Sequence, residues 1–579
     1  MKTYKNLLIV ALSLILFSAC DQNYLDPISK VDPGEDASAP AVSVSFPPEG
    51  YELQTNEALA SIAFNFEVRD DIEISSISLK LDGTELTSYS SFKDYRVAKE
   101  TYTYTEVATG PHVFSVVATD TDGNTTTKNV NFTKAPPYTP VYEGEVFYMP
   151  FNNEFREMNS LSLATVVGSP TFTSGIQGGT AYAGATDSYL SFPSTILQGS
   201  TSMSASFWMK IDKSNDRAGI LVVSPPASGN NDRTKGFRFF RESSNDGATQ
   251  RFKLNVGNGT SDAWVDGGTA ADVTPNTGEW THFAFTISPT KADVYINGTL
   301  VKESAITGID WTNCSQISIM SGAPNWTGWD HLSDASLLDE LRIFTKELTA
   351  DEVKTIMLKE QASFYMDFNG DYKDNISGDE ATTVGIPTFA YGAGISGDAY
   401  KGATDSYLTF PSADLATGTS FSTSFWLKID ATATRAGILA IAPESPSDPS
   451  QKPSGFGFIR EGNASSQKFV LLAGNGTNAT WFNPGTPATI DPTVKTGWVH
   501  FAVSVASTSA AFYMDGVQVS QGSLSGFNWA NVGDLSIMSG APNFSGWNHK
   551  SEPGLMDDLY FFPKALSQEE VSLLRNEGL

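Results

Sequence analysis

Apolar and polar residues alternate along most of this chain in short runs. The run MSASFWMKI at 203–211 has an apolar residue at every odd position, and VYING at 294–298 and FYMDG at 512–516 end in Asn-Gly or Asp-Gly. Alternation of period two predicts strands, and these dipeptides predict tight hairpins. The pattern therefore predicts an almost entirely β protein.

Helical signals occur at two places only. LTADEV at 348–353 and LSQEEV at 566–571 each combine a hydroxyl residue with a Glu three positions later, between two apolar residues. This arrangement is a capping box with a hydrophobic staple. We therefore expect one short helix to begin after Thr349 and another after Ser567.

About three quarters of the chain is a large module present twice. GATDSYLSFPS at 184–194 returns at 402–412 with one change, and ISIMSGAPNWTGWDH at 317–331 returns at 535–549 as LSIMSGAPNFSGWNH. We therefore expect two modules, 145–360 and 361–579. A tandem copy is typical of a binding protein, because linked weak sites act at high effective concentration.

The region before the repeats divides into a tether and a smaller domain. Residues 20–40 are polar, acidic and Pro-rich, which predicts a flexible tether. Residues 41–134 contain about seven short alternating runs, with turns at Asp82-Gly83 and Asp122-Gly123. This spacing predicts an immunoglobulin-like sandwich.

The first twenty residues have the features of a processing signal. Lys2 and Lys5 precede an apolar run at 7–17, which is too short to span a bilayer, and Phe-Ser-Ala-Cys follows at 17–20. This end resembles a bacterial lipobox, which implies a signal peptide at 1–19 and a diacylated Cys20 that holds the chain on a membrane. The alternative is an ordinary signal peptide that ends near a chance Cys.

Composition and charge narrow the class of protein. Only 18% of the residues are charged, 12% are aromatic, and 49 Gly and 29 Pro interrupt the apolar runs, as in extracellular β modules. A net charge of −28 repels phosphate backbones, so nucleic acid is excluded as a partner. The second Cys, Cys314, aligns with Val532, which predicts a buried apolar role without a disulfide.

Two longer motifs carry a family resemblance. LLDELRIFTKELTADEV at 337–353 and GEWTHFAFTISPTKADVYING at 278–298, with partners at 555–571 and 496–516, resemble the strands and closing helix of laminin-G-like domains. The resemblance implies an all-β fold, in which the immunoglobulin-like sandwich is followed by two tandem concanavalin A-like jelly rolls. The fold hosts lectins, adhesion modules and glycosidases.

The layout as a whole also resembles the surface glycan-binding lipoproteins of starch-utilisation-type uptake systems. This second resemblance implies a lipid-anchored protein on the bacterial outer membrane, exposed at the cell surface, with carbohydrate and an outer-membrane uptake complex as partners. The first alternative is a protein-binding adhesion or assembly component. The second is a glycoside hydrolase of concanavalin A-like fold.

The loops 321–334 and 539–552 contain the candidate glycan-binding residues. Sugar rings stack their C–H faces on aromatic rings, and their hydroxyls need polar partners, so loops that combine both suit carbohydrate. The competing interpretation is that the aromatic side chains cover the core and the histidines form hydrogen bonds with backbone groups. The candidates are Trp326, Trp329, Asp330, His331, Phe544, Trp547, Asn548 and His549, together with Trp264 and Trp481, which follow GNGT loops.

Catalytic carboxylates are not evident in the sequence. Glycosidases need an acid and a nucleophile or base on either side of the sugar bond. The nearest pairs are Asp339-Glu340 and Asp557-Asp558, and adjacent strand residues are expected to point to opposite faces. We therefore predict a protein that is not an enzyme.

Two further sets of repeated residues leave alternatives open. The family resemblance implies a structural Ca²⁺, for which Asp187, Asp339, Asp405 and Asp557 are candidate ligands, and turn capping is the alternative. Arg241-Glu242 and Arg460-Glu461 recur after aromatic strands as either an ion pair or a glycan clamp.

Overall fold

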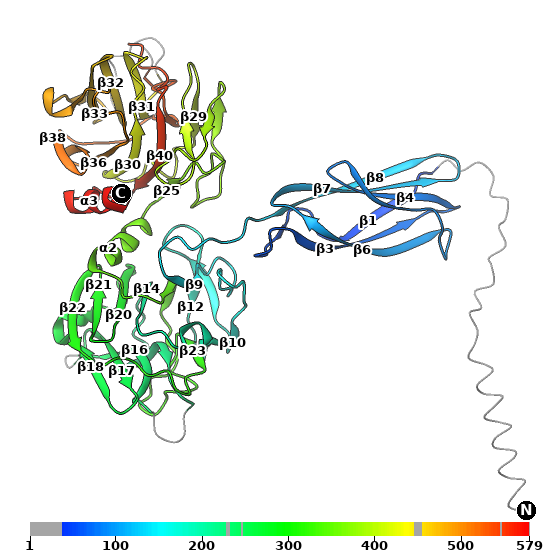
Figure 1. Cartoon of the computed structure of the whole chain (residues 1–579), viewed down its shortest axis with the longest axis horizontal. Helices are drawn as coiled ribbons and strands as arrows, with labels where there is room; N and C mark the ends of the chain where they lie inside the picture. The colour runs from blue at the N-terminus through cyan, green and yellow to red at the C-terminus, as the bar shows by residue number, and fades with distance from the viewer. Residues whose placement is uncertain (1–37, 227–231, 245–246, 445–453, 545–546, 578–579) are drawn as a thin grey trace, which may run out of the picture. The chain divides into compact units, whose positions relative to one another are not determined.

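The computed structural model describes residues 38–226, 232–244, 247–444, 454–544 and 547–577 (Figure 1). The predicted signal peptide, Cys20 and nearly all of the tether lie outside these residues. The chain divides into two compact units, Met1–Thr139 and Pro140–Leu579. In the described part, no helix is long and apolar enough to cross a membrane.

The N-terminal unit is a sandwich of two sheets. Strand β3 alternates buried and exposed residues along ASIAFNFEVR, and Phe64 of this strand stacks on Phe114 across the core. One sheet has the order β1-β3-β6 and the other β2-β8-β7-β4-β5. The strands are β1 (Ala41–Phe46), β2 (Tyr51–Leu53), β3 (Ala60–Arg69), β4 (Ile74–Leu81), β5 (Thr84–Tyr89), β6 (Val97–Val107), β7 (Gly110–Asp120) and β8 (Thr125–Lys134).

The first repeat is a sandwich of two antiparallel sheets. One sheet contains, in spatial order, β10 (Thr165–Val167), β13 (Tyr189–Pro193), β23 (Gln316–Ile319), β15 (Arg217–Val223), β16 (Lys235–Ser243), β17 (Gln250–Asn258) and β18 (Asp262–Asp266), with β19 (Asp272–Val273) beside β17. The other contains β11 (Thr171–Ser174), β12 (Thr180–Ala183), β24 (Leu337–Phe344), β14 (Met203–Lys210), β20 (Thr281–Ile287), β21 (Lys291–Ile296) and β22 (Thr299–Ala305), with β9 (Glu145–Met149) beside β24.

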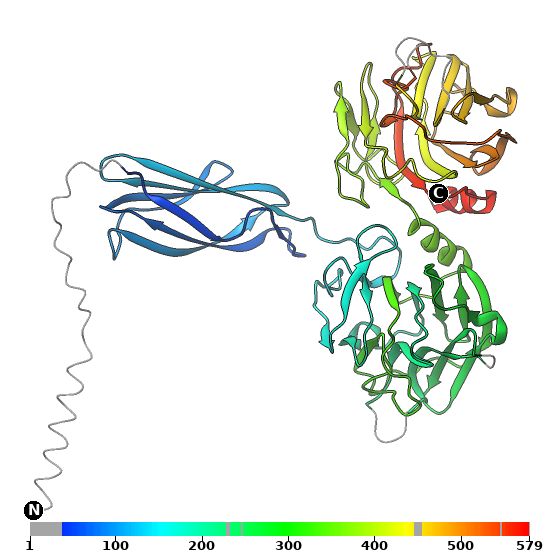
Figure 2. The ribbon, with the colours of Figure 1, turned by 180° about the vertical axis from the view of Figure 1, so that it is seen from behind.

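The second repeat has the same strand order, and Figure 2 shows its ribbon from behind, in yellow-green to red. Its first sheet contains β26 (Thr382–Val384), β29 (Tyr407–Phe410), β39 (Leu535–Ile537), β31 (Arg435–Ile441), β32 (Phe456–Asn463), β33 (Ser466–Gly474) and β34 (Ala479–Phe482), with β35 (Thr489–Ile490) beside β33. Its second contains β27 (Thr388–Ala390), β28 (Ala399–Lys401), β40 (Leu555–Phe562), β30 (Phe421–Lys428), β36 (Val499–Ala506), β37 (Ser509–Met514) and β38 (Val517–Ser523), with β25 (Phe364–Met366) beside β40.

Both predicted helices are present and begin where the capping boxes place them. Helix α2 (Ala350–Lys359) has Thr349 as its N-cap, and the Glu352 carboxylate accepts a hydrogen bond from the backbone N–H of Thr349. Helix α3 (Gln568–Glu577) is capped in the same way by Ser567. Short 3₁₀ turns occur at Ser194–Leu197, Gly268–Ala271 and Thr486–Ala488.

The two sheets of each module differ in what covers their outer faces. Their inner faces form the core, where Phe207, Phe239 and Phe283 pack together and the buried Cys314 lies, as its alignment with Val532 predicted. In the first module α2 covers the outer face of the sheet that contains β14, because Val353 and Ile356 pack on Tyr295 and its neighbours. The outer face of the β16 sheet carries loop 321–334 instead.

Candidate functional site

Two exposed tryptophans lie together on the outer face of the first module's β16 sheet. In β18, Ala263 and Val265 face the core, so Trp264 between them points outward. Trp329 reaches the same place from loop 321–334, and the two ring centroids are 6.2 Å apart with an interplanar angle of 18°. Trp264 is 39% exposed and Trp329 41% exposed, so the rings form an open aromatic surface, which we call platform 1.

Trp326 and His331 lie beneath platform 1. Trp326 is 1% exposed and packs on Val222 and Phe240, which point away from the core. His331 stacks on Trp326 at 4.2 Å, and burial lowers the pKa of His331 to about 3. Because both side chains are buried, a ligand cannot contact them. Trp326 and His331 therefore support the exposed rings.

The second module repeats this arrangement. The ring centroids of Trp481 and Trp547 are 5.4 Å apart, and both rings are about as exposed as those of platform 1. We call this second pair of rings platform 2. Phe544 is buried in the position of Trp326. His549 is also buried, which lowers its pKa to about 4.

The remaining loop candidates are at the surface. Asp330 and Asn548 are exposed and follow the platform tryptophans directly. Both have a positive φ, 60° and 61°, a conformation that Asn and Asp tolerate better than most residues. Of the ten predicted residues, the structure therefore brings three in each module to the surface and places the other two behind them.

Sequence reasoning missed Arg233. Its guanidinium carbon lies 4.6 Å from the ring centroid of Trp329 and 5.6 Å from that of Trp264. Arg233 Nε is 3.5 Å from Asp262, which also lines a recess of about 240 Å³ with Asn258, Ser261 and Thr307. No motif marks Arg233, and the only sequence signal is that the polar residues of this region differ between the repeats.

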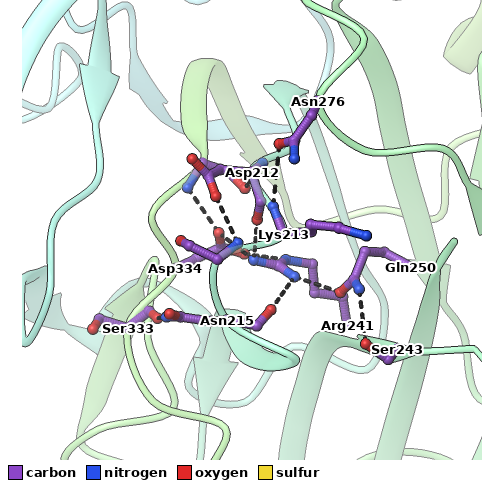
Figure 3. A network of polar contacts seen from close by, with 11 residues as sticks. Asp212, Lys213, Asn215, Arg241, Ser243, Gln250, Asn276, Ser333 and Asp334 are labelled. Atoms are coloured by element: carbon purple, nitrogen blue, oxygen red, sulfur yellow. Dashed lines mark hydrogen bonds and ion pairs between the residues drawn. The ribbon is translucent and has the colours of Figure 1, made fainter. Parts of the chain in front are cut away.

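The predicted arginine pairs do not form with the adjacent glutamates. Figure 3 shows Arg241 at the centre of a polar network, where it donates to both carboxylate oxygens of Asp334 at 2.7 and 2.9 Å. Arg460 pairs in the same way with Glu552. Because these arginines are fully buried, they are structural ion pairs and cannot clamp a glycan.

The expectation that Asp339 and Glu340 point to opposite faces is wrong. Ser206 pairs with Arg342 but Trp208 pairs with Asp339, so β24 has a bulge in which Glu340 takes a φ of 51°. Leu338 and Leu341 on either side face the core, which turns both acids outward. Burial and the neighbouring Glu340 raise the pKa of Asp339 to about 8.

These acids already have structural partners. Asp339 accepts a hydrogen bond from the backbone of Ile176 at 2.8 Å, and Asp557 accepts one from Ile395. Glu340 accepts from Tyr148 and pairs with Arg342. Among the described residues, no three or more His, Cys, Asp or Glu side chains are grouped so that they could hold a metal ion, and the Ca²⁺ candidates Asp187 and Asp405 belong to no such group.

The family is shown by two matches that together cover more than half of the chain. Residues 184–354 and 401–572 each match a laminin G model described as the concanavalin A-like lectin/glucanases superfamily, and the chain belongs to this superfamily. The all-β fold with two tandem jelly rolls is thereby confirmed. The superfamily contains binding domains and hydrolases alike, so membership does not decide whether the chain is catalytic.

Solved structures and curated proteins add little beyond the fold. Domain 4 of the arabinanase AbnA from Geobacillus stearothermophilus, solved with arabinotriose, is 21% identical, with 37% of this chain and 98% of that chain covered and a TM-score of 0.29. Domains LG4-5 of mouse laminin α1 are 10% identical, with 74% and 96% covered and a TM-score of 0.22. No curated protein matches the chain.

Proposed function

We propose that this protein is a cell-surface carbohydrate-binding lipoprotein that captures poly- or oligosaccharides through its two jelly-roll modules. The observation that carries the proposal is the pair of exposed tryptophans at the same place in both modules. Exposed indole rings held by a rigid support suit the C–H faces of sugar rings, which bind by stacking and are oriented by a few polar groups.

The surroundings of platform 1 favour a sugar over a protein partner. The recess beside it combines an amide, two hydroxyls and a carboxylate with apolar side chains, and it is lined by Asn258, Ser261, Asp262, Thr307, Val256, Ala263, Ala305 and Ile306. Sugar hydroxyls need such partners, whereas protein-binding surfaces are broader apolar patches. Two exposed rings beside a recess of mixed polar and apolar lining therefore favour a sugar over the adhesion alternative.

A binding role is also favoured over a catalytic one. The outward-facing acids Asp339 and Glu340 are occupied by backbone amides, Tyr148 and Arg342. They lie on β24, and Trp264 lies on β18 of the opposite sheet, whose outer face carries the loop with Trp329. A sugar stacked on the platform would not reach them.

The anchor and the location are part of the same proposal. Acylation at Cys20 and the tether at 20–40 would hold the modules on the outside of the bacterial outer membrane, where an uptake complex is the expected partner. The sequence of the first twenty residues supports this part, and it can fail independently of carbohydrate binding.

Replacing the exposed rings tests the binding site. Trp329→Ala and Trp547→Ala should each lower glycan affinity by about 1 to 3 kcal/mol, by analogy with base stacking on aromatic side chains, and should change the melting temperature little. A glycan array of the full chain, followed by calorimetry with a bound glycan, measures the first effect. Thermal unfolding measures the second.

The matched control is the buried ring in the same loop. Trp326→Ala should lower the free energy of unfolding by about 3 to 5 kcal/mol, because a fully buried Trp is removed. If Trp329→Ala binds every glycan as the unmodified chain does, the site lies elsewhere in the molecule.

A further inference from the structure

The guanidinium of Arg233 lies over the two rings of platform 1, and most of its N–H groups make no hydrogen bond within the described residues. Its side chain is about one third exposed, and its one ionic neighbour in the described residues is Asp262, 3.5 Å from Nε. Within the same residues, the two terminal nitrogens make no hydrogen bond. A guanidinium in this state can still donate two parallel hydrogen bonds to a carboxylate.

A buried arginine fixes the segment that presents Arg233. Arg238 is fully buried and donates to the backbone carbonyls of Asp232 and Arg233, the latter at 3.1 Å. It also reaches Asn255 at 3.4 Å, and Asn255 donates to Asp262 at 2.8 Å. Because Asp262 also contacts Arg233, these contacts hold both the backbone and the side chain of Arg233. The guanidinium is therefore preorganised over the rings.

The second module keeps the platform but not the network. The matching stretches GFRFFRE at 236–242 and GFGFIRE at 455–461 align Arg238 with Gly457, and the GNGT loops align Asn255 with Leu472 and Asp262 with Ala479. Leu472 packs instead in an apolar cluster with Ile459, Val470 and Phe544. Because both modules have the same fold, the network is not needed for folding as such.

We propose that Arg233 makes platform 1 selective for acidic sugars, whose ring carboxylate it binds. Lys452, which aligns with Arg233 in the second module, lies outside the described residues. This inference rests on the proposed carbohydrate-binding function. With a net charge of −28 the protein repels polyanions at long range, so recognition has to come from a directed contact. Arg233 is the specificity residue, and Arg238 is a positioning residue.

The test uses the full chain with platform 2 silenced by Trp481→Ala and Trp547→Ala. The probes are polygalacturonate and its fully methyl-esterified form, which share a backbone and differ in carboxylate charge. We expect the charged polymer to bind at least tenfold more tightly, and Arg233→Gln to abolish this preference without weakening the ester. Salt should reduce the preference.

Two further variants sharpen the experiment. Lys210→Gln removes one positive charge at Trp280, where the ammonium lies 5.0 Å from the ring, and should leave both affinities unchanged. Arg233→Lys keeps the charge but loses the paired donors, so it should retain only part of the preference. Thermal unfolding of each variant shows that the fold is intact.

Several outcomes would overturn the inference. Equal losses on both polymers after Arg233→Gln would make Arg233 a general contact, and a gain on both would make it a cover that competes with the sugar. If neither polymer binds while neutral glycans bind in a Trp329-dependent manner, the acidic-sugar inference fails and the proposed function stands. If no glycan binds the unmodified chain, the proposed function itself fails.

Discussion

Trp326 and Trp329 lie in the same loop but differ in burial. They are three residues apart in one loop, yet Trp326 fills a space over Val222 and Phe240 and Trp329 stays at the surface. Burial removes about 200 Å² of a Trp from water, so the first ring stabilises the fold and the second is available to a ligand. Single residues in this site therefore have separable effects on stability and binding.

The buried carboxyl group of the single residue Asp557 should make the free energy of unfolding depend on pH. Burial and the neighbouring Asp558 raise the pKa of Asp557 to about 7. Because the folded state holds this proton more tightly than the unfolded state, the contribution of Asp557 is complete below about pH 4 and is lost as the pH rises through about 7. Asp557→Asn has no such proton to lose.

Urea unfolding from pH 4 to pH 7 measures the difference. The free energy of unfolding of the unmodified chain, relative to Asp557→Asn, should fall by about 1 kcal/mol per pH unit over this range. Two curves that run parallel with pH would show that Asp557 does not ionise differently in the folded state.

At the scale of elements, a buried ion pair ties a strand to a loop. Arg241 of β16 binds Asp334, which precedes β24, and also donates to the backbone carbonyls of Asp212 and Asn215 (Figure 3). The pair therefore joins three segments that are far apart in the sequence. Arg460 and Glu552 do the same in the second module.

Removing one member of this pair should destabilise the first module strongly. Asp334→Ala leaves the Arg241 guanidinium buried without its counter-ion and should lower the free energy of unfolding by about 3 to 5 kcal/mol. The double variant Arg241→Met with Asp334→Ala should recover part of the loss. Denaturant unfolding checks both, and a loss under 1 kcal/mol for the single variant would contradict the role of this pair.

At the scale of the whole molecule, two platforms on one chain favour avidity. A polymer that binds both modules holds the second site at high effective concentration after the first has bound. Acylation at Cys20 would in addition hold both platforms at the same membrane.

The anchor gives a prediction about the whole chain. If Cys20 is acylated, Cys20→Ala should move the protein from the membrane fraction to the soluble fraction, because the acyl chains provide the membrane affinity. Mass spectrometry of the mature N-terminus checks the modification directly. A chain that stays in the membrane fraction, with no acyl mass at its N-terminus, is not a lipoprotein.

Local patterns determined the fold class. Period-two alternation predicted the strands, and Thr349 with Glu352 predicted where α2 begins, because turn chemistry and capping depend on residues within about four positions of each other. The repeats predicted two modules of one fold, because similar sequences with the same pattern of apolar residues form similar cores. The partners of Arg241 were not predictable, because Asp334 is 93 positions away.

Only the tertiary structure decided what the candidate residues do. It separated Trp329 from Trp326 by placing an apolar cluster under one ring, and it turned Asp339 and Glu340 to the same face through a bulge that alternation cannot reveal. It also brought Arg233 over rings from β18 and loop 321–334. Exposure, strand register and side-chain proximity depend on residues distant in the chain, and no local pattern contains them.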